Sequence, residues 1–363
     1  MPARAVAPAP SREGAPDASF AHLVIAWQRT HGRNALPWQN TRDPYRVWLS
    51  EIMLQQTQVA TVLGYYERFL MRFPDVAALA AAPLDDVLAL WSGLGYYSRA
   101  RNMHGCAQAV VQQHGGRFPS TSAVLMALPG IGRSTAAAIA AFCFGERVAV
   151  LDGNVKRVLT RVLGFGGDLA EAAPERALWA RATELLPHEG VERYTQGVMD
   201  LGATVCTTRS PACLLCPVAN LCVAARTQTQ NAYPVKTRKL KRGTREHIWL
   251  WLRWRGQVWL VQRPDTGVWA GLWGLPEFDS PALFDAAAMG WPGAAEALPS
   301  FTHVLTHLDW RLHPLRWTLP ERTGDQRVAA IVQRWPTGRW FDRDQALAAG
   351  LPAPLRKLLL GSP

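Results

Sequence analysis

Four cysteines that lie close together in the chain have the clearest potential for chemistry. Cys206, Cys213, Cys216 and Cys222 follow the spacing Cys-x6-Cys-x2-Cys-x5-Cys. Thiolates at such short separations are typical metal ligands in a reducing compartment. Structural zinc sites usually pair two Cys-x2–4-Cys segments across a longer gap, and only one pair here has that spacing. The spacing therefore predicts a metal centre, most simply an iron–sulfur cluster, with zinc and unligated cysteines as the alternatives.

Two acidic residues stand next to predicted helices. Glu51 comes directly before the run Ile-Met-Leu-Gln-Gln-Thr-Gln, and we expect it at the head of a helix. Asp152 lies between an apolar run and another predicted helix. Acidic side chains at such positions commonly interact with the helix dipole or cap the helix. Taken alone, each residue is better explained by its helix end than by catalysis.

A glycine-containing turn precedes an alanine-rich helix. The turn reads Leu-Pro-Gly-Ile-Gly-Arg-Ser over residues 128–134, with glycines at Gly130 and Gly132. Glycine lets the backbone approach a ligand closely, and the first N–H groups of a helix bind anions. Such a turn can hold a DNA phosphate without reading the base sequence. A plain connection between two helices is the alternative.

The elements that must position these residues differ between the two parts of the chain. Apolar residues at three-to-four spacing predict helices at His22–Arg29, Ser50–Met71, Pro83–Trp91, Ala100–His114, Ser134–Phe142, Val155–Leu163 and Glu175–Leu186. Alternating apolar and polar residues predict strands at His247–Arg253 and Gln257–Arg263. The pattern indicates a mainly α domain followed by a smaller α+β domain.

Length, charge and composition suggest how the chain is organised. A chain of 363 residues with a formal net charge of +11 favours two domains and a polyanionic partner. We expect a flexible tail over 1–18, a helical domain over 19–225 with its cysteine loop at 206–222, a basic linker over 226–245 and the α+β domain over 246–363. No secretory signal or membrane-length apolar segment is found, so a cytoplasmic location is expected.

Five separate motifs occur in an order that resembles one enzyme family. They are residues 51–58, residues 93–102 (Gly-Leu-Gly-Tyr-Tyr-Ser-Arg-Ala-Arg-Asn), the turn at 128–134, residues 151–157 (Leu-Asp-Gly-Asn-Val-Lys-Arg) and the cysteine loop. Together they closely resemble the adenine DNA glycosylases of the MutY type, members of the helix–hairpin–helix base-excision superfamily. The resemblance is strong over about residues 20–225. It implies an enzyme that flips adenine out of the duplex and cleaves its N-glycosidic bond.

The resemblance also implies roles for the residues of the reaction centre. Glu51 matches the general acid and base, and Asp152 matches the carboxylate that stabilises the cationic sugar. Asn154 matches a residue that orients the centre. Ser134 stands where lyase relatives carry a nucleophilic lysine, which implies a monofunctional glycosylase that hydrolyses without cutting the strand. Two further residues, Trp38 and Leu54, are expected to line the adenine pocket.

Other matching positions imply contacts with DNA and with the base opposite adenine. Gln56 and Tyr96 match residues that wedge into the base stack, and Thr57 and Leu94 resemble lesion-side contacts. The hairpin glycines Gly130 and Gly132 should approach the phosphates. Residues 305–307 (Leu-Thr-His) stand where the family usually has Phe-Ser-His, so the hydroxyl of Thr306 and the ring of His307 should inspect oxidised guanine.

The C-terminal motif at residues 258–277 resembles the Nudix-like domain of the same family. The residues after Glu277 lack the glutamate cluster that a catalytic Nudix helix needs to hold a divalent cation, so recognition without hydrolysis is expected. The resemblance further implies one [4Fe–4S] cluster on the four cysteines. It implies a monomer, in the nucleoid if bacterial, whose partner is double-stranded DNA carrying adenine opposite 8-oxoguanine or guanine.

The sequence disfavours three alternatives to this function. A bifunctional enzyme of the endonuclease III type is disfavoured by Glu51, Ser134 and the additional domain. A DNA-binding module without activity is disfavoured because both carboxylates are present. A Nudix nucleotide hydrolase is disfavoured by the missing glutamate-rich helix.

Overall fold

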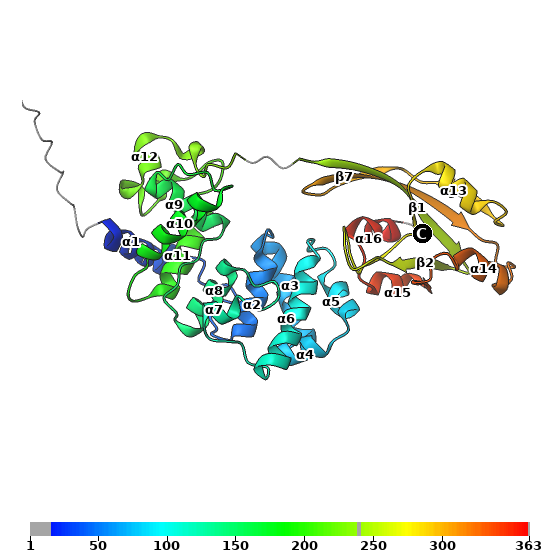
Figure 1. Ribbon diagram of the computed structural model, residues 1–363, viewed down its shortest axis with the longest axis horizontal. Helices are drawn as coiled ribbons and strands as arrows, with labels where there is room; N and C mark the ends of the chain where they lie inside the picture. Colours follow the sequence, from blue (N-terminus) through cyan, green and yellow to red (C-terminus); the bar gives the residue numbers. More distant parts are fainter. Residues whose placement is uncertain (1–15, 238–240, 362–363) are drawn as a thin grey trace, which may run out of the picture. The chain divides into compact units, whose positions relative to one another are not determined.

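The computed structural model describes residues 16–237 and 241–361 (Figure 1). These residues divide into two compact units. The first unit combines the described residues up to 51 with those of 118–239, and the second combines 52–117 with those from 240 onward. Each unit therefore consists of two segments that are distant in sequence. The predicted tail falls mostly outside the described residues, although the first helix already begins at Pro16.

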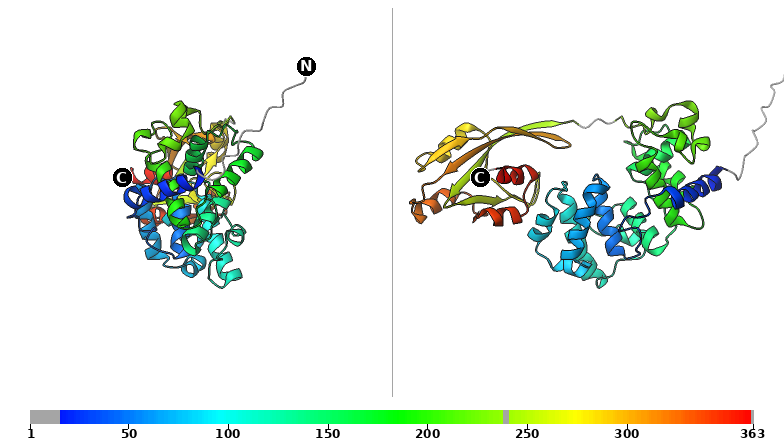
Figure 2. Two further views of the ribbon diagram at one scale, coloured as in Figure 1. Left: turned by 90° about the vertical axis from the view of Figure 1, so that its left-hand side faces the viewer. Right: turned by 180° about the vertical axis from the view of Figure 1, so that it is seen from behind.

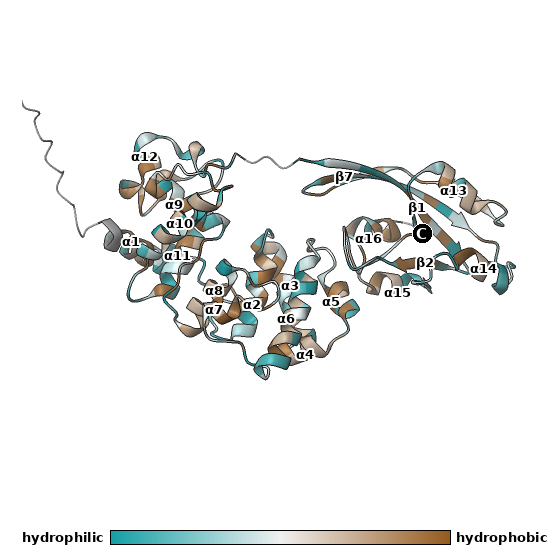
Figure 3. Cartoon of the chain, viewed as in Figure 1, coloured by the Kyte–Doolittle hydropathy of each residue, from teal (hydrophilic) through white to brown (hydrophobic). Residues whose placement is uncertain are grey.

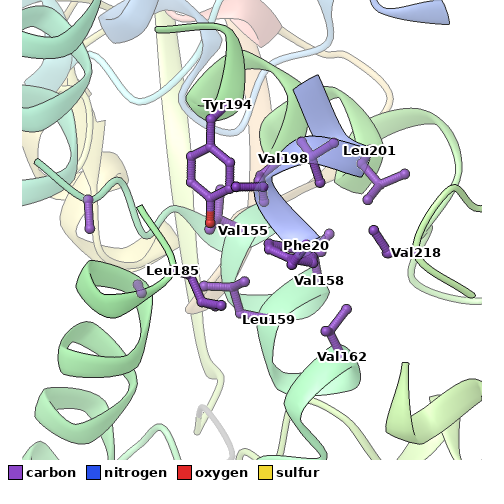
Figure 4. Close-up of a cluster of buried hydrophobic side chains, with 14 of the residues drawn as sticks. Phe20, Val155, Val158, Leu159, Val162, Leu185, Tyr194, Val198, Leu201 and Val218 are labelled. Carbon is purple, nitrogen blue, oxygen red and sulfur yellow. The ribbon is translucent and has the colours of Figure 1, made fainter. Parts of the chain in front are cut away.

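The first unit is helical (Figure 2), and a large cluster of buried apolar side chains joins several of its helices. Its helices are α1 (Pro16–His31), most of α2 (Pro44–Leu54), α7 (Ser122–Leu125), α8 (Arg133–Phe144), α9 (Gly153–Leu163), α10 (Ala172–Glu184), α11 (Val191–Thr204) and α12 (Val223–Thr227). Helix α9 buries Val155, Val158, Leu159 and Val162, which share one face because of the helical period. Figure 4 shows these side chains together with those of α1 and α11.

The helical part of the second unit contains four helices. They are α3 (Val59–Arg72), α4 (Val76–Ala81), α5 (Leu84–Trp91) and α6 (Ser98–His114). Phe69 packs edge-on against Trp91 with ring centroids 5.7 Å apart, and both are fully buried. The predicted single helix over Ser50–Met71 is wrong, because the chain turns between α2 and α3. Gln56 adopts a left-handed φ of 56° in that turn, which a continuous helix does not allow.

The remainder of the second unit is a mixed sheet with helices, which confirms the α+β prediction. Its strands are β1 (Gly243–Trp254), β2 (Gln257–Gln262), β3 (Trp273–Gly274), β4 (Glu277–Phe278), β5 (Ala294–Ala297), β6 (Phe301–Val304), β7 (Leu308–Thr318) and β8 (Gly338–Phe341). The main strand order is β3-β2-β1-β7-β5. Strands β1 and β7 run parallel, with Ile248 opposite His313, whereas the other pairs are antiparallel. Strand β1 begins four residues before the predicted His247.

Tryptophans and aliphatic residues fill the core of the sheet. Four helices accompany the strands: α13 (Pro281–Ala288), α14 (Asp325–Val332), α15 (Arg343–Ala348) and α16 (Ala353–Leu360). Trp254 and Trp259 both contact Trp340, at 5.8 Å and 5.2 Å between ring centroids. Strand β1 is hydrophilic over its first residues and hydrophobic further along (Figure 3). Among the described helices, none has the length and apolar character needed to span a bilayer.

Candidate functional site

Glu51 lies in the last turn of α2, so its predicted place at the head of a helix is wrong. The helix begins at Pro44, seven residues earlier, because proline is well suited to the first helical position. The dipole at this end of a helix does not favour a negative charge. Burial, together with the nearby Asp152 carboxylate, raises the pKa of Glu51 from 4.5 to about 8. Glu51 therefore holds a proton at neutral pH.

Asp152 occupies the N-cap of α9, as its sequence context suggests. Its Oδ1 accepts a hydrogen bond from the backbone N–H of Val155 at 2.7 Å. Burial raises the pKa of Asp152, and the backbone amides of Val155 and Asn154 oppose that rise by stabilising the carboxylate. The charge on Asp152 in turn contributes to the raised pKa of Glu51, so the two carboxyls influence each other's protonation. Protonated Glu51 can donate a proton, and the charged form of Asp152 can stabilise a cation.

Ser134, at the end of the glycine turn, is bonded to the segment that carries Asp152. The Ser134 hydroxyl accepts a hydrogen bond at 3.2 Å from the N–H of Leu151, the residue before Asp152. Gly130 has a left-handed φ of 73°, and Gly132 is the extended N-cap of α8. Both glycines are exposed, whereas Ile131 between them is buried and anchors the turn. The turn therefore presents backbone and the start of a 12-residue helix to solvent.

Asn154 and Arg157 connect the first turns of α9 to the cysteine loop. The Arg157 guanidinium donates to Asn154 Oδ1 at 2.8 Å, to the Gly202 carbonyl at 2.6 Å and to the Cys206 carbonyl at 2.7 Å. A Cβ on Gly202 would lie 2.7 Å from the Asn154 Cβ, so glycine is required for this close approach. The helix capped by Asp152 is thus tied directly to the first cysteine.

One turn further along α9, Arg161 is almost completely buried under the same loop. Its guanidinium donates to the carbonyls of Thr207 at 2.7 Å, Thr208 at 3.1 Å and Gln230 at 2.9 Å. It also approaches Cys206 Sγ at 3.3 Å. A buried guanidinium needs such a full set of acceptors. Sequence reasoning missed Arg161, since its acceptors lie 45 to 69 residues away.

The four cysteines of the loop are free thiols that lie near one another. Burial raises the pKa of the Cys216 thiol to about 11, and Cys206, Cys222 and Cys213 all act on it electrostatically. Among the residues that the structure describes, no three His, Cys, Asp or Glu side chains are arranged as ligands of a metal ion. Thiolate sulfur is nevertheless the donor type that an iron–sulfur cluster requires, and the loop supplies four cysteines. Val218, between the third and fourth cysteines, anchors the loop in the core (Figure 4).

The second unit contains a cavity of about 880 Å³ that brings several predicted contact residues together. Gln56, Tyr96, Thr306 and His307 all line it, although Gln56 and Thr306 are 250 residues apart. The hydroxyls of Tyr96 and Thr306 are hydrogen bonded at 2.9 Å. Leu305, which replaces the family's usual phenylalanine, lines the same cavity. Cavities of this size with a few polar groups are typical ligand sites.

Two predicted contact residues lie beside this cavity and are joined by a buried arginine. Leu94 is only 6% exposed, which places its side chain in the interior. Arg99 donates to Thr57 Oγ1 at 3.2 Å, to the Leu94 carbonyl at 3.1 Å and to the Gln55 carbonyl at 2.6 Å. Arg99 thereby holds the turn of Gln56 and the turn of Tyr96 in one arrangement. Its position in the 93–102 motif was the only sequence signal for this role.

The remaining predicted pocket residues occupy different elements. Trp38 is 7% exposed and lies in the loop that precedes α2. Leu54 is the last residue of α2, three residues after Glu51, and is partly buried. Residues three apart on a helix lie on adjacent positions of its surface. Leu54 therefore flanks the face of α2 that carries Glu51.

The carboxylate of the Nudix-like motif is already paired. Glu277 forms an ion pair with Arg263, and its Oε1 accepts a hydrogen bond from Trp249 Nε1 at 3.1 Å. The Arg263 guanidinium also lies over the Trp310 ring, 5.4 Å from its centroid. Glu277 thus has structural partners in the sheet.

Comparison with known proteins identifies both parts of the chain. Residues 49–183 match the HhH-GPD superfamily of base excision DNA repair proteins, and residues 248–361 match the NUDIX domain. The chain is similar to the structure of a thermostable thymine-DNA glycosylase, with a TM-score of 0.53 and 28% identity over 58% of this chain and 97% of that one. It also shares the fold of an endonuclease III–DNA complex, at a TM-score of 0.50 and 21% identity over 59% and 98% of the two chains.

Curated relatives extend the similarity over nearly the full length. The adenine DNA glycosylase of Buchnera aphidicola subsp. Schizaphis graminum is 33% identical over 94% of this chain and 97% of the relative. The human adenine DNA glycosylase is 31% identical over 96% of this chain and 74% of the relative. These matches bear out the resemblance found in the sequence motifs. The chain therefore belongs to the adenine DNA glycosylase family of base excision DNA repair enzymes.

Proposed function

We propose that this DNA glycosylase is monofunctional and hydrolyses the N-glycosidic bond of adenine mispaired with 8-oxoguanine or guanine. The functional division follows the sequence, with a glycosylase domain over 19–225, a basic linker over 226–245 and a lesion-recognition domain over 246–363. The family matches to residues 49–183 and 248–361 support that division.

The raised pKa of Glu51 and its electrostatic coupling to Asp152 carry the proposal. Glu51 holds its proton up to about pH 8, so it can protonate the adenine ring and let the base leave as a neutral molecule. Two backbone amides stabilise the charged form of Asp152, and in that form Asp152 can stabilise the cationic sugar that remains. Glu51, now ionised, then accepts a proton from the attacking water. Asn154 acts on this centre through Arg157, which fixes the start of α9.

Two residues support hydrolysis without strand cleavage. Ser134 offers a hydroxyl, already bonded to the Leu151 amide, where lyase relatives need an amine. Lys156, one turn after Asp152, has its amine in an ion pair with Glu175 at 2.5 Å. An ammonium group held by a carboxylate is a poor nucleophile, because its lone pair is protonated. No amine of this centre is therefore poised for Schiff-base chemistry.

The cavity in the second unit is the proposed site for the base opposite adenine. Gln56 and Tyr96 come from exposed turns and would enter the base stack. Thr306 and His307 offer a hydroxyl and an imidazole that could bond the altered edge of 8-oxoguanine. Gly130 and Gly132 would hold the phosphate backbone through N–H groups. The other two predicted contacts, Thr57 and Leu94, would act through the turns that Arg99 holds.

Cys206, Cys213, Cys216 and Cys222 would hold one [4Fe–4S] cluster. The cysteine spacing, with only one Cys-x2-Cys pair, and the family assignment support this choice over zinc. When bound, the cluster would add covalent cross-links to a loop that is otherwise held by hydrogen bonds from Arg157 and Arg161. Iron content and visible absorbance of the purified protein test the assignment, and colourless zinc-loaded protein would contradict it.

A single-turnover assay tests the proposed reaction. Duplexes carrying adenine opposite 8-oxoguanine, guanine or thymine are incubated with excess enzyme, and strand breaks are counted with and without alkali. Adenine release from the first two duplexes, and breaks only after alkali, are expected. Efficient strand cleavage without alkali would instead favour a bifunctional enzyme, and no release from any duplex would refute the proposal.

A further inference from the structure

A short segment between α15 and α16 lies against the helical part of the second unit. We call residues 350–352 the C-terminal strap. The Gly350 carbonyl accepts a hydrogen bond from the Trp273 amide at 2.9 Å, and Leu351 is completely buried. A Cβ on Gly350 would lie 3.0 Å from the Cβ of Leu88 in α5. The strap is therefore in direct contact with α5, the helix that leads into the turn of Tyr96.

The carbonyl oxygen of Leu351 binds two side chains from that turn region. Ser92 Oγ and the Tyr97 hydroxyl each donate to it at 3.0 Å. The Ser92 hydroxyl in turn accepts a hydrogen bond from Arg356 Nε at 3.2 Å. Ser92, Tyr97 and Leu351 are all buried, so water cannot satisfy these oxygens and the internal hydrogen bonds must do so.

These two side chains enclose a backbone that is strained. Between Ser92 and Tyr97, the φ angles of Gly93, Gly95 and Tyr96 are 105°, 71° and 48°. A left-handed φ at a non-glycine residue such as Tyr96 costs free energy and persists only when surrounding contacts hold it. The Tyr97 hydroxyl also accepts from the Gly93 amide, at 3.4 Å. The strap thus fixes both ends of the strained turn.

The tip of the same turn is bonded to the C-terminal part of the unit a second time. The Tyr96 hydroxyl meets Thr306 Oγ1 at 2.9 Å, and Ala353, next to the strap, lines the same cavity as Tyr96. The turn is therefore fixed at its base by the strap and at its tip by the loop of Thr306. Tyr96 itself remains 46% exposed and available to DNA.

We propose that the C-terminal strap is a positioning element for base flipping, which presets Tyr96 through Ser92, Tyr97 and the Leu351 carbonyl. The inference rests on the wedge role given to Tyr96 in the proposed function. Ser92 and Tyr97 are positioning residues that act through the turn. Without the hydroxyls of Ser92 and Tyr97, the turn of Tyr96 relaxes. Part of the free energy of DNA binding is then needed to restore the turn, which weakens base flipping.

The test combines hydrogen exchange without DNA and base release with it. Ser92→Ala and Tyr97→Phe each remove one hydrogen-bond donor to the Leu351 carbonyl. A double variant carries both substitutions. We expect the amides of residues 93–97 to exchange about fivefold to tenfold faster in the single variants. Adenine release opposite 8-oxoguanine should slow by a similar factor, whereas the pH midpoint set by Glu51 should not move. Tyr233→Phe, the same change in the first unit, is the control.

The outcomes separate this inference from the proposed function. Faster exchange together with slower base release supports the strap as a positioning element. Unchanged exchange in the folded double variant, or faster exchange with no loss of base release, overturns it. If the unaltered protein releases no adenine, the proposed function fails first, and the exchange data then show only whether the strap fixes the turn. Arg356→Lys, which keeps the charge near Ser92, should retain most of the parent's slow exchange.

Discussion

The two units hold their functional residues in opposite ways. In the first, Glu51 and Asp152 belong to regular helix ends, and burial sets their protonation. In the second, Gln56 and Tyr96 lie on exposed turns with left-handed φ angles of 56° and 48°. Chemistry at a carboxyl needs a low-dielectric surrounding, whereas insertion into a base stack needs an accessible side chain. The contrast shows that reaction and recognition demand different supports.

The contrast between reaction residues and recognition residues predicts its largest effect at Glu51. Glu51→Gln keeps the size of the side chain and removes the transferable proton. General acid–base catalysis typically contributes about 10²- to 10⁴-fold, so adenine release should fall by about 10³-fold while DNA binding persists. Single-turnover base release and a DNA-binding titration measure the two effects. Glu67→Gln, on the exposed face of α3, is the control, and a loss of less than tenfold at Glu51 would remove it from the reaction.

The support beneath Asp152 can be weakened separately. Arg161→Lys keeps the charge but cannot reach the carbonyls of Thr207, Thr208 and Gln230 together. The free energy of unfolding should fall by about 3 kcal/mol, because the buried Arg161 guanidinium loses its hydrogen bonds to these carbonyls. Urea denaturation measures the change, with exposed Arg176→Lys as the control. Equal stability of the two variants would show that the helix of Asp152 does not depend on this network.

The pH dependence follows from the raised pKa of Glu51. The proton to be donated is present below about pH 8 and lost above it, so base release should fall about tenfold per pH unit in the alkaline range. Glu51→Gln should abolish this alkaline limb in whatever activity remains. A rate that stays constant from pH 7 to about pH 10 would contradict the assignment.

The same pKa shift predicts how stability depends on pH. The folded-state pKa of about 8 exceeds the unfolded value of 4.5, so stability is lost as the pH rises from about 4.5 through about 8. Glu51→Gln should avoid this loss. The variant should match the parent in acid and be more stable by a few kcal/mol near pH 9 in thermal or urea unfolding.

The smallest change in activity is expected at Thr306, in the cavity proposed to hold the base opposite adenine. Thr306→Val removes the hydroxyl bonded to Tyr96 and leaves the reaction centre unaltered. We expect the preference for adenine opposite 8-oxoguanine over guanine to drop about fivefold, with little change in release opposite guanine. Thr302→Val, on the exposed face of β6, is the control. An unchanged preference would assign lesion reading to other residues of the cavity.

Much of the fold could be predicted from sequence because it depends on local pattern. The helix over Val155–Leu163 and the strands after His247 were correct, since apolar spacing alone determines them. The turn at Gln56 was missed, because Gln-Gln-Thr-Gln contains no glycine or proline to signal it. Because the turn was missed, Glu51 was expected at the start of a long helix, whereas it lies in the last turn of α2.

Within the candidate site, the sequence motifs predict which residues act, but the contacts that support those residues could not be predicted. The motifs predicted a paired function for Glu51 and Asp152, and the structure brings the two close enough to interact. Arg99 and Arg161 were not recognised, because their importance depends on backbone carbonyls that gather only after folding. A side chain that binds distant main-chain oxygens leaves no periodic signal in the sequence.

The parallel pairing of β1 with β7 has a consequence for how the protein is made. Gly243 pairs with Leu308, so the ribosome must synthesise 65 further residues after Gly243 before β1 can begin to pair with β7. The delay is longer for residues 52–117, because the rest of their unit is the part of the chain from 240 onward. Such long-range contacts slow folding and leave apolar strands exposed on the ribosome. We therefore expect this half of the enzyme to be acquired last during synthesis and to be the part that most needs protection by chaperones.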